Sequence, residues 1–347
     1  MIQSRKTPTI QDVARFANVS AATVSRALSR PDRVSEGTRA RIAEAIHVTG
    51  YTLNQAARSL RQRSAHTILV ALPDIRNQFF SSILDAIERE ATGRGYGVLV
   101  ANLYFGHETA RRLQDYMLSN RADGLLLLDG SLNPETLKAI TLPPYSVPLV
   151  VACEEIPDHG FHTVVTDNAQ AAERVTRHLL DLGHTRIGHI MGPETNVVAR
   201  DRLAGFQRTM QQEGHPVPAE WVFRGNFEMA SGFAAAARFV SLAERPTAMF
   251  AANDESAIGF LSGLRQHGIE CPRDISVVSF DDLSVAAHYT PPLTTMRQPR
   301  ETLGRLAAEM LIDILEGTEP QRGPLRIVLN SELIVRESTG HPAPQSH

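Results

Sequence analysis

From Thr67 onward, short apolar segments alternate with amphipathic stretches of helical spacing, and this alternation constrains the fold more than any other feature of the sequence. Strands that are apolar on both faces and separated by helices form parallel sheets covered on both sides. The segments are too many for one ordinary sheet, so we predict two α/β lobes that hold a ligand in the crevice at their strand ends. The predicted strands are 68–72, 98–102, 124–128, 149–152, 164–166, 186–191, 248–251 and 275–280, and the predicted helices lie near 80–94, 108–121, 168–182, 199–213, 230–243, 254–267 and 299–316.

The region from Thr9 to Gly50 predicts three short helices. Thr9 opens a Ser/Thr-x-x-acid helix start, Ser20 can cap a second helix over 21–28, and Ser35 can cap a third that ends at Gly50. Helical spacing divides the second helix into a packing face of Val24, Ala27 and Leu28 and a free face of Ala21, Ala22, Ser25 and Arg26. Such a pair of helices joined by a tight turn is the helix-turn-helix layout. A small helical bundle with a solvated face is the alternative.

Charge is distributed unevenly between this head and the rest of the chain. Residues 1–65 hold eleven Lys or Arg against four Asp or Glu, a net charge of +7, whereas the remaining 24 basic and 34 acidic residues give −10. Because cationic side chains on a phosphate backbone release condensed counterions, a basic head on an acidic body predicts contact with double-stranded DNA.

Four motifs of the head are TIQDVA at 9–14, VSAATVSRAL at 19–28, VSEGTR at 34–39 and GY at 50–51. They resemble the head of the LacI (lactose repressor) family of bacterial transcription regulators, and the likeness continues to about Thr339. The resemblance implies a repressor that binds a palindromic operator as a homodimer and is controlled by a small-molecule effector, a sugar or nucleoside, held between the lobes. The DNA-binding residues that it implies are Thr9, Ser20, Ala21, Ala22, Ser25, Arg26, Ser35, Thr38, Tyr51, Asn54, Ala57 and Leu60.

Residues 54–60, which follow the head, have the composition of a helix but span only about two turns, which is too short for a helix to be stable alone in water. A plain linker is one interpretation; the resemblance implies a hinge helix in which Leu60 inserts between base pairs in the minor groove. The predicted domains are the head (1–52), hinge and linker (53–66), two-lobed core (67–340) and tail (341–347). The first lobe takes about 67–165 and 296–325 and the second about 166–295 and 326–340, with crossings near Thr166, Thr295 and Leu329.

Polar and aromatic residues gather where several predicted strands and helices end. One of the adjacent rings Phe79 and Phe80 can face the cleft, although both could belong to the core. An arginine on a helix beside a cleft offers a fixed fork of donors, although a surface salt bridge is the alternative for Arg202. Of the pair Asp281 and Asp282, one is expected to accept from the ligand and the other to cap a helix. The effector-binding residues implied by the resemblance are Phe79, Asp167, Asn196, Arg202, Phe227, Asn253 and Asp281. The segment 192–194 before the arginine helix and the pair Phe79 and Phe227 resemble the nucleoside- and pentose-responsive branch of the family.

Motifs of catalytic chemistry are absent from the sequence. It has no dinucleotide or Walker phosphate loop and no nucleophile elbow, and no histidine spacing suits a metal. We therefore expect no enzyme, cofactor, metal or catalytic residue, with His184 and His189 at the surface or capping helices, and Cys153 and Cys271 as buried structural thiols. Without a signal peptide or a long apolar segment, the chain is expected to be cytoplasmic with no membrane partner. The alternatives are a sugar-binding receptor, which the basic head disfavours, and a sugar-processing enzyme or kinase that uses Asp281 and Asp282.

Overall fold

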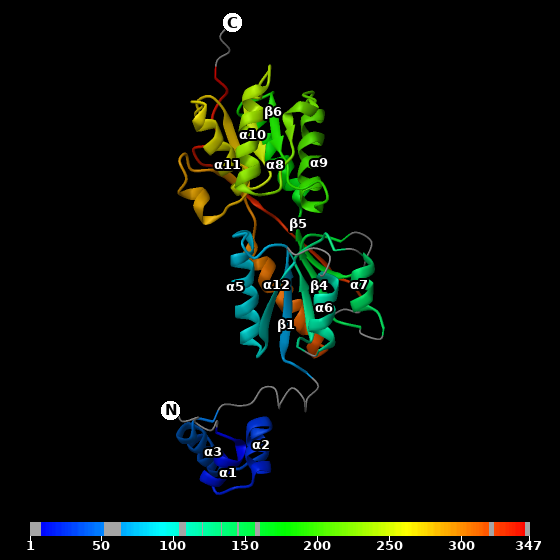
Figure 1. The fold of residues 1–347 in the computed structure, drawn as a ribbon, viewed down its shortest axis with the longest axis vertical. Helices are drawn as coiled ribbons and strands as arrows, with labels where there is room; N and C mark the ends of the chain where they lie inside the picture. The colour runs from blue at the N-terminus through cyan, green and yellow to red at the C-terminus, as the bar shows by residue number, and fades with distance from the viewer. Residues whose placement is uncertain are drawn as a thin grey trace, which may run out of the picture. The chain divides into compact units, whose positions relative to one another are not determined.

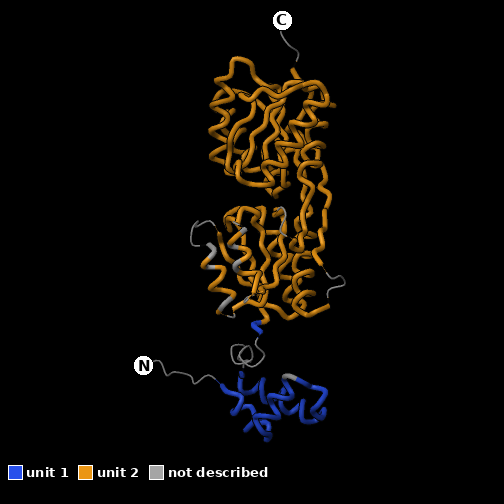
Figure 2. The backbone as a smooth tube through the Cα atoms, turned by 90° about the vertical axis from the view of Figure 1, so that its right-hand side faces the viewer, with its two compact units in different colours: residues 1–65 blue, residues 66–347 orange. Residues whose placement is uncertain are grey.

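The computed structural model describes residues 8–51, 64–103, 109–119, 121–132, 134–143, 146–156, 160–318 and 323–343. The chain forms two compact units, residues 1–65 and residues 66–347, which Figure 2 colours separately. Each unit has its own hydrophobic core, and each is described by itself below.

The head contains the three predicted helices, α1 (Ile10–Phe16), α2 (Ala21–Ser29) and α3 (Glu36–Thr49), with a 3-10 turn at Pro31–Arg33. Their starts follow from the sequence: the Asp12 carboxylate accepts from the Thr9 amide (2.9 Å), and the Ser20 hydroxyl accepts from the Thr23 amide (3.1 Å). Gly50 ends α3 at a φ of 65°, a left-handed conformation that glycine adopts without strain. The fully buried members of this core are Val13, Ala14, Ala17, Val24, Ile42 and Ala45.

Three details of the head differ from prediction. Ala21, assigned to the free face, packs against the head core, whereas Leu28, assigned to the packing face, is 37% exposed. The spacing Ala21, Val24, Ala27 fills the contact with the core, and Leu28 lies in the last turn of α2. Ser35 stands at the start of α3, but its hydroxyl bonds the Thr38 hydroxyl (2.9 Å) instead of a backbone amide.

The second unit is built on two six-stranded sheets, one in each lobe, and each sheet has helices packed against it (Figure 1). The sheet of the first lobe is parallel throughout, in the order β11-β5-β4-β3-β1-β2. Its elements are β1 (Thr67–Leu72), α5 (Phe79–Gly93), β2 (Gly97–Asn102), α6 (Thr109–Leu118), β3 (Gly124–Leu127), α7 (Pro134–Thr141), β4 (Leu149–Cys153), β5 (His162–Thr166), α12 (Arg300–Glu316) and β11 (Arg326–Leu329).

The second lobe repeats this architecture in the order β12-β10-β9-β8-β6-β7, with only the β10–β12 pair antiparallel. Its elements are α8 (Asn168–Asp181), β6 (Ile187–Ile190), α9 (Val197–Gln212), a 3-10 turn at Ala219–Trp221, β7 (Val222–Phe223), α10 (Met229–Ser241), β8 (Ala248–Ala251), α11 (Asp254–Gln266), β9 (Ser276–Asp281), a 3-10 turn at Ser284–Ala287, β10 (Thr294–Arg297) and β12 (Glu332–Ile334). The predicted fold class, two parallel-sheet α/β lobes after a helix-turn-helix head, is confirmed.

The chain crosses between the lobes three times, after β5, after β10 and after β11, and the crossings lie on one side of the unit in Figure 2. The prediction that 326–340 belong to the second lobe is wrong for residues 326–329, because β11 pairs with β5 in the first sheet. The second crossing follows Arg297, close to the predicted Thr295, but residues 296 and 297 belong to the second lobe because Thr294–Arg297 pair with β9. Short strands that carry polar or exposed residues, β7, β10, β11 and β12, went unpredicted because they lack a long apolar run.

Both predictions about the histidines are wrong, because His184 and His189 are buried rather than exposed. The His184 ring bonds Thr247 (2.8 Å), Ser276 (3.0 Å) and the Gly340 carbonyl (2.8 Å). His189 lies on β6 between the rings of Phe206 and Phe250, and burial lowers its pKa to about 3, which keeps it neutral. These histidines are structural members of the second lobe.

The two cysteines differ in burial. Cys153 is buried, as predicted, and burial, followed by Glu154, raises the pKa of its thiol, which makes it a poor nucleophile. Cys271 is only partly buried, contrary to the prediction, and its thiol donates to the Ser338 carbonyl (3.2 Å).

Candidate functional site

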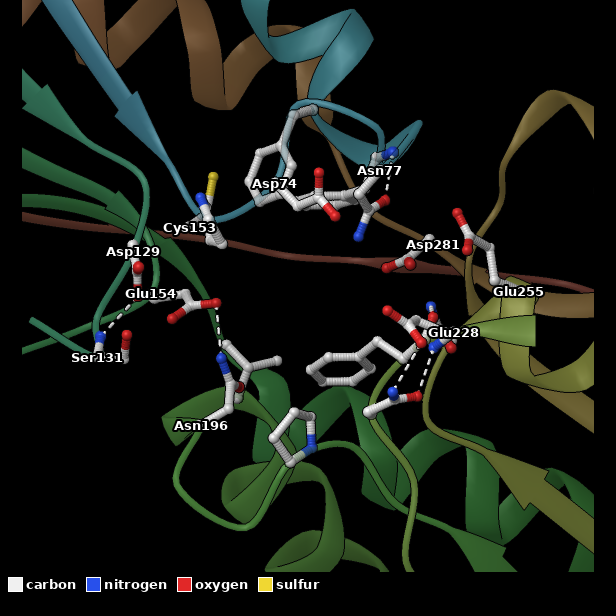
Figure 3. A pocket seen from close by; sticks show the side chains of 18 of the residues that line it. Asp74, Asn77, Asp129, Ser131, Cys153, Glu154, Asn196, Glu228, Glu255 and Asp281 are labelled. Atoms are coloured by element: carbon white, nitrogen blue, oxygen red, sulfur yellow. Dashed lines mark hydrogen bonds between the residues drawn. The ribbon is translucent and has the colours of Figure 1, made fainter. Parts of the chain in front are cut away.

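A cavity of about 490 Å³ opens between the two lobes. Its lining follows the carboxyl ends of strands from both sheets: β1, β3 and β4 in the first lobe, and β6, β7, β8 and β9 in the second. This is where ligands bind in open parallel sheets, because side chains from several strands converge there. Figure 3 shows ten of the lining residues labelled around this space.

Arg202, on α9, forms the buried floor of the cavity on the second-lobe side and is only 4% exposed. Its guanidinium donates to the Asn168 side-chain oxygen (3.0 Å) and to the Ala252 carbonyl (2.5 Å), and it lies 3.6 Å from the centre of the Phe280 ring. An Asp281 carboxylate oxygen stands 3.9 Å from Arg202 Nη2. Burial, partly offset by Asp281, lowers the arginine pKa to about 10, so the group stays cationic at neutral pH. The alternative of a surface salt bridge is therefore wrong.

Asp281, at the end of β9, is buried and has a φ of 109°, outside the usual range of a non-glycine residue. Its carboxylate accepts from Gln298 Nε2 (2.7 Å), and burial raises its pKa despite the nearby Arg202. Asp282 does not cap a helix as predicted: its two oxygens accept from Arg336 (2.7 Å) and Arg297 (2.7 Å), and it does not line the cavity. The 3-10 turn that follows is instead stabilised by Asp254, whose carboxylate accepts from the amide of Leu283 at the start of the turn (2.7 Å).

Phe227 and Asn253 close the cavity on the second-lobe side. Phe227 has a φ of 67°, and its carbonyl accepts from Asn253 Nδ2 (2.8 Å), which fixes the loop that carries the ring. A Cβ at Gly192 would lie 2.2 Å from the ring atom Cζ of Phe227, so only glycine permits this ring position. Asn253 also caps α11 by accepting from the Ser256 amide (3.0 Å).

On the first-lobe side the rings of Phe79 and Phe80 pack edge to face with centroids 5.1 Å apart, and both line the cavity. The two interpretations of these rings are thus both partly right, since each ring also belongs to the hydrophobic core of the first lobe.

Asp129 and Glu154 follow β3 and β4 and are 7% and 8% exposed. Glu154 accepts from the Gly130 amide (2.8 Å) and from Asn196 Nδ2 (2.8 Å), so this last bond joins the two lobes across the cavity (Figure 3). Burial, and next the charge of Asp129, raise the pKa of Glu154 to about 7.

The structure brings six of the seven predicted effector residues to the cavity: Phe79, Asn196, Arg202, Phe227, Asn253 and Asp281. Asp167 does not line it; it is an exposed cap of α8 whose carboxylate accepts from the Gln170 amide (2.8 Å). The prediction missed lining residues such as Asp74, Asn77, Asp129, Glu154, Glu255 and Gln298. Asp129 directly follows the predicted strand 124–128, and Glu154 is separated from the predicted strand 149–152 only by Cys153, so the strand-end argument could have found both.

Of the nine predicted DNA-binding residues that the structure describes, five are exposed to solvent and four are partly buried. Thr9, Ser20, Ala22, Arg26 and Ser35 are exposed. Ala21, Ser25, Thr38 and Tyr51 are partly buried. Asn54, Ala57 and Leu60, and with them the predicted hinge helix, lie outside the described residues.

A helix-turn-helix head followed by a two-lobed core with a cavity at its strand ends defines a DNA-binding regulator that carries a ligand-binding domain. Residues 9–54 match the bacterial regulatory proteins of the lacI family, and residues 176–339 match the periplasmic binding protein-like domain. The HTH-type transcriptional repressor CytR of Escherichia coli (strain K12) is 36% identical over 333 residues, which cover 95% of this chain and 96% of that protein. The ribose operon repressor of the same organism is 34% identical over 331 residues, covering 95% and 99%.

The fold of the chain is also similar to a solved structure of the lac repressor dimer bound to operator and the anti-inducer ONPF. The TM-score is 0.87 at 28% identity, and the match covers 96% of this chain and 100% of that chain. The chain belongs to the LacI family of transcriptional regulators, as the head motifs predicted.

None of the described helices has the length and apolar character needed to cross a membrane. Within the described residues, no group of three or more His, Cys, Asp or Glu side chains is arranged to hold a metal ion.

Proposed function

We propose that this protein is a cytoplasmic repressor that binds a palindromic operator as a homodimer through its head, and that a sugar or nucleoside in the interlobe cavity controls this binding. The observation that carries the proposal is the buried Arg202–Asp281 pair in a cavity flanked by Phe79 and Phe227, in a chain that also has a helix-turn-helix head. Rings that flank paired donors and acceptors suit a carbohydrate or nucleoside. The repressor names of the relatives and the operator-bound dimer of the lac repressor support the DNA-binding part.

The control mechanism couples two equilibria. Effector contacts residues of both lobes, changes their relative orientation, and so changes the spacing of the two heads in the dimer. In each subunit, the hinge segment then places Leu60 in contact with the operator only when the two heads have the spacing that the DNA requires. Reciprocity demands that operator alter effector affinity by the same factor, typically about 5- to 150-fold.

An enzyme that uses Asp281 and Asp282 is disfavoured by the geometry. Asp282 is held by Arg297 and Arg336 and lies outside the cavity lining, so the two carboxylates do not face one substrate. We infer that the protein is not an enzyme.

The test uses purified full-length protein and fluorescence anisotropy. Inverted-repeat duplexes and random duplexes are compared at low and physiological salt, and the operator hit is then titrated with the compounds that stabilise the protein in a thermal-shift screen of sugars, nucleosides and purines. We expect a specific inverted repeat to bind more tightly than random duplex, and the hit compound to change that affinity. Equal affinity for all duplexes at low salt, with and without compounds, would refute the proposal.

A further inference from the structure

The charge of the cavity lining is strongly unbalanced. The described residues that line it carry two guanidiniums, Arg76 and Arg202, and six carboxylates, Asp74, Asp129, Glu154, Glu228, Glu255 and Asp281. All of these carboxylates are labelled in Figure 3, where they surround the open space from both lobes. Even with Glu154 partly protonated at neutral pH, the acidic groups outnumber the guanidiniums, so a ligand that enters this cavity meets an excess of negative charge.

Both guanidiniums are already engaged by the protein. Arg76 donates to the two oxygens of Asp74 (3.0 and 2.7 Å), and Arg202 binds Asn168 and Ala252 and stands beside Asp281. These pairs account for two of the six carboxylates. The other four, Asp129, Glu154, Glu228 and Glu255, have no Arg or Lys nitrogen of the described residues within 4.0 Å.

The helix starts at the cavity are capped by side chains of the protein. Helices α5, α9 and α11 begin there, and backbone amides at such ends are the usual ligands of a phosphate. In each helix a cavity-lining asparagine accepts from one of these amides: Asn77 from Phe79 (2.9 Å), Asn196 from Ala199 (3.0 Å) and Asn253 from Ser256 (3.0 Å). At each of these helix ends, one of the amides that could hold an anion thus binds the protein's own asparagine.

Asp129 and Glu154 form a wall of acceptors on the first-lobe side. Both are more than nine-tenths buried, and each accepts from backbone or side-chain amides: Asp129 from Ser131 (2.8 Å), and Glu154 from Gly130 and Asn196. Burial, and next the charge of Asp129, raise the pKa of Glu154, and the two hydrogen bonds and the charge of Arg202 offset this rise only in part. A ligand hydroxyl or amino group placed here would donate to an acceptor that water reaches poorly, so the hydrogen bond would contribute more to the free energy of binding than one at the surface.

We propose that the effector is an uncharged or cationic molecule rich in hydrogen-bond donors, that its donors bind Asp129 and Glu154, and that these two residues exclude metabolites carrying a phosphate or carboxylate. This inference rests on the proposed function, whose effector it narrows to unphosphorylated sugars or nucleosides. Adding a 5′-phosphate to the effector weakens its binding at least ~100-fold, which is about 2.7 kcal/mol.

The experiment measures binding of matched pairs to the full-length protein by thermal shift and isothermal titration. D-Ribose, further monosaccharides and the four ribonucleosides are each compared with their phosphorylated forms. We expect every tight binder to be an unphosphorylated member of its pair. A phosphorylated compound that binds the wild-type protein as tightly as its parent, or more tightly, would overturn the inference.

Isosteric variants test the two named residues. Asp129→Asn and Glu154→Gln each weaken binding of the unphosphorylated compound at least ~10-fold, and the double variant reduces the discrimination against its phosphate to below ~10-fold. Glu220→Gln, an exposed carboxylate outside the cavity lining, leaves both affinities unchanged and serves as the matched control. Unaltered discrimination in a folded double variant would also overturn the inference.

Failure here is distinguishable from failure of the proposed function. If no member of any pair binds, the inference falls together with the effector site, whereas inverted-repeat binding by the same protein preparation would leave the DNA-binding part intact.

Discussion

Ionisation of Glu154 is expected to lower the stability of the core as pH rises. The folded-state pKa of Glu154 is about 7 against an ordinary value of 4.5, because the carboxyl is buried and lies near Asp129. Between these two pH values the folded protein holds a proton that the unfolded chain has released, so the free energy of unfolding falls through this window. The difference between the two values corresponds to about 3 kcal/mol, most of which is lost between pH 5 and pH 8.

Other buried groups also titrate in this range, so the wild-type profile alone does not isolate Glu154. Asp254 has its pKa raised to about 7 by burial and by Asp281, and it acts in the same direction. His178 and His184 have lowered pKa values because of burial, and they destabilise the fold as pH falls below about 6.5. The informative quantity is the difference between wild type and Glu154→Gln at each pH.

The assay is urea unfolding followed by far-ultraviolet circular dichroism at pH 5, 6, 7 and 8, without effector and at fixed protein concentration. The side chain introduced by Glu154→Gln has a single acceptor oxygen and cannot replace both bonds from Gly130 and Asn196, which gives a pH-independent loss of about 1 kcal/mol. On top of this offset, wild type should lose about 2 to 3 kcal/mol relative to the variant between pH 5 and pH 8. Glu220→Gln is expected to follow the wild-type profile. A difference between wild type and Glu154→Gln that stays constant within about 0.5 kcal/mol would refute the reasoning.

Four further substitutions separate the roles of the cavity and the head. Arg202→Met removes the donors to Asn168 and Ala252 and leaves Asp281 without its cation, so urea unfolding should show a loss of about 3 kcal/mol and calorimetry a loss of effector binding; wild-type stability would contradict the buried pair. Gly192→Ala displaces the Phe227 ring and should weaken effector binding in calorimetry, with operator affinity in the absence of effector unchanged. Arg26→Ala should weaken operator binding and reduce the slope of log affinity against log salt by about one; an unaltered slope would argue against a phosphate contact. Leu60→Ala should weaken operator binding in anisotropy while leaving effector binding intact, and equal operator affinity would rule out insertion between base pairs.

The long apolar strands and the amphipathic helices could be predicted from sequence because burial on both faces leaves a pattern in single segments. The edge and crossing strands could not, because a strand such as Thr294–Arg297 is specified by its neighbour β9 and not by its own composition. The burial of the two histidines could not be predicted either, because it depends on residues far away in the sequence. His184 looks polar in sequence, but its partners Thr247, Ser276 and Gly340 lie 63, 92 and 156 positions away.

Residues of the candidate site that stand in a recognisable motif could be predicted from the sequence. Residues whose role depends on the balance of charge around the cavity could not. Arg202, Phe227 and Asp281 stand in recognisable segments, and the structure brings them to one cavity. The role of Asp129 and Glu154 depends on which cations are absent nearby, and a sequence does not report distances between residues of different strands. Their importance becomes visible only when the pairing of Arg76 and Arg202 with other carboxylates is known.

Control of the lobes by a ligand requires that the ligand bind their two orientations with different affinity. The structure provides two hydrogen-bonded links that depend on this orientation. Gln298, at the second crossing, donates to Asp281 (2.7 Å) and accepts from the Thr166 hydroxyl at the first crossing (3.0 Å). A ligand donor that binds Asp281 therefore competes with Gln298 for the carboxylate and weakens the hydrogen bonds that join the two crossings. On the other side of the cavity, Glu154 and Asn196 join the lobes directly. An effector that donates to both Asp281 and Glu154 therefore acts on both links at once, whereas a ligand that reaches only one of them would bind without fixing the orientation of the lobes.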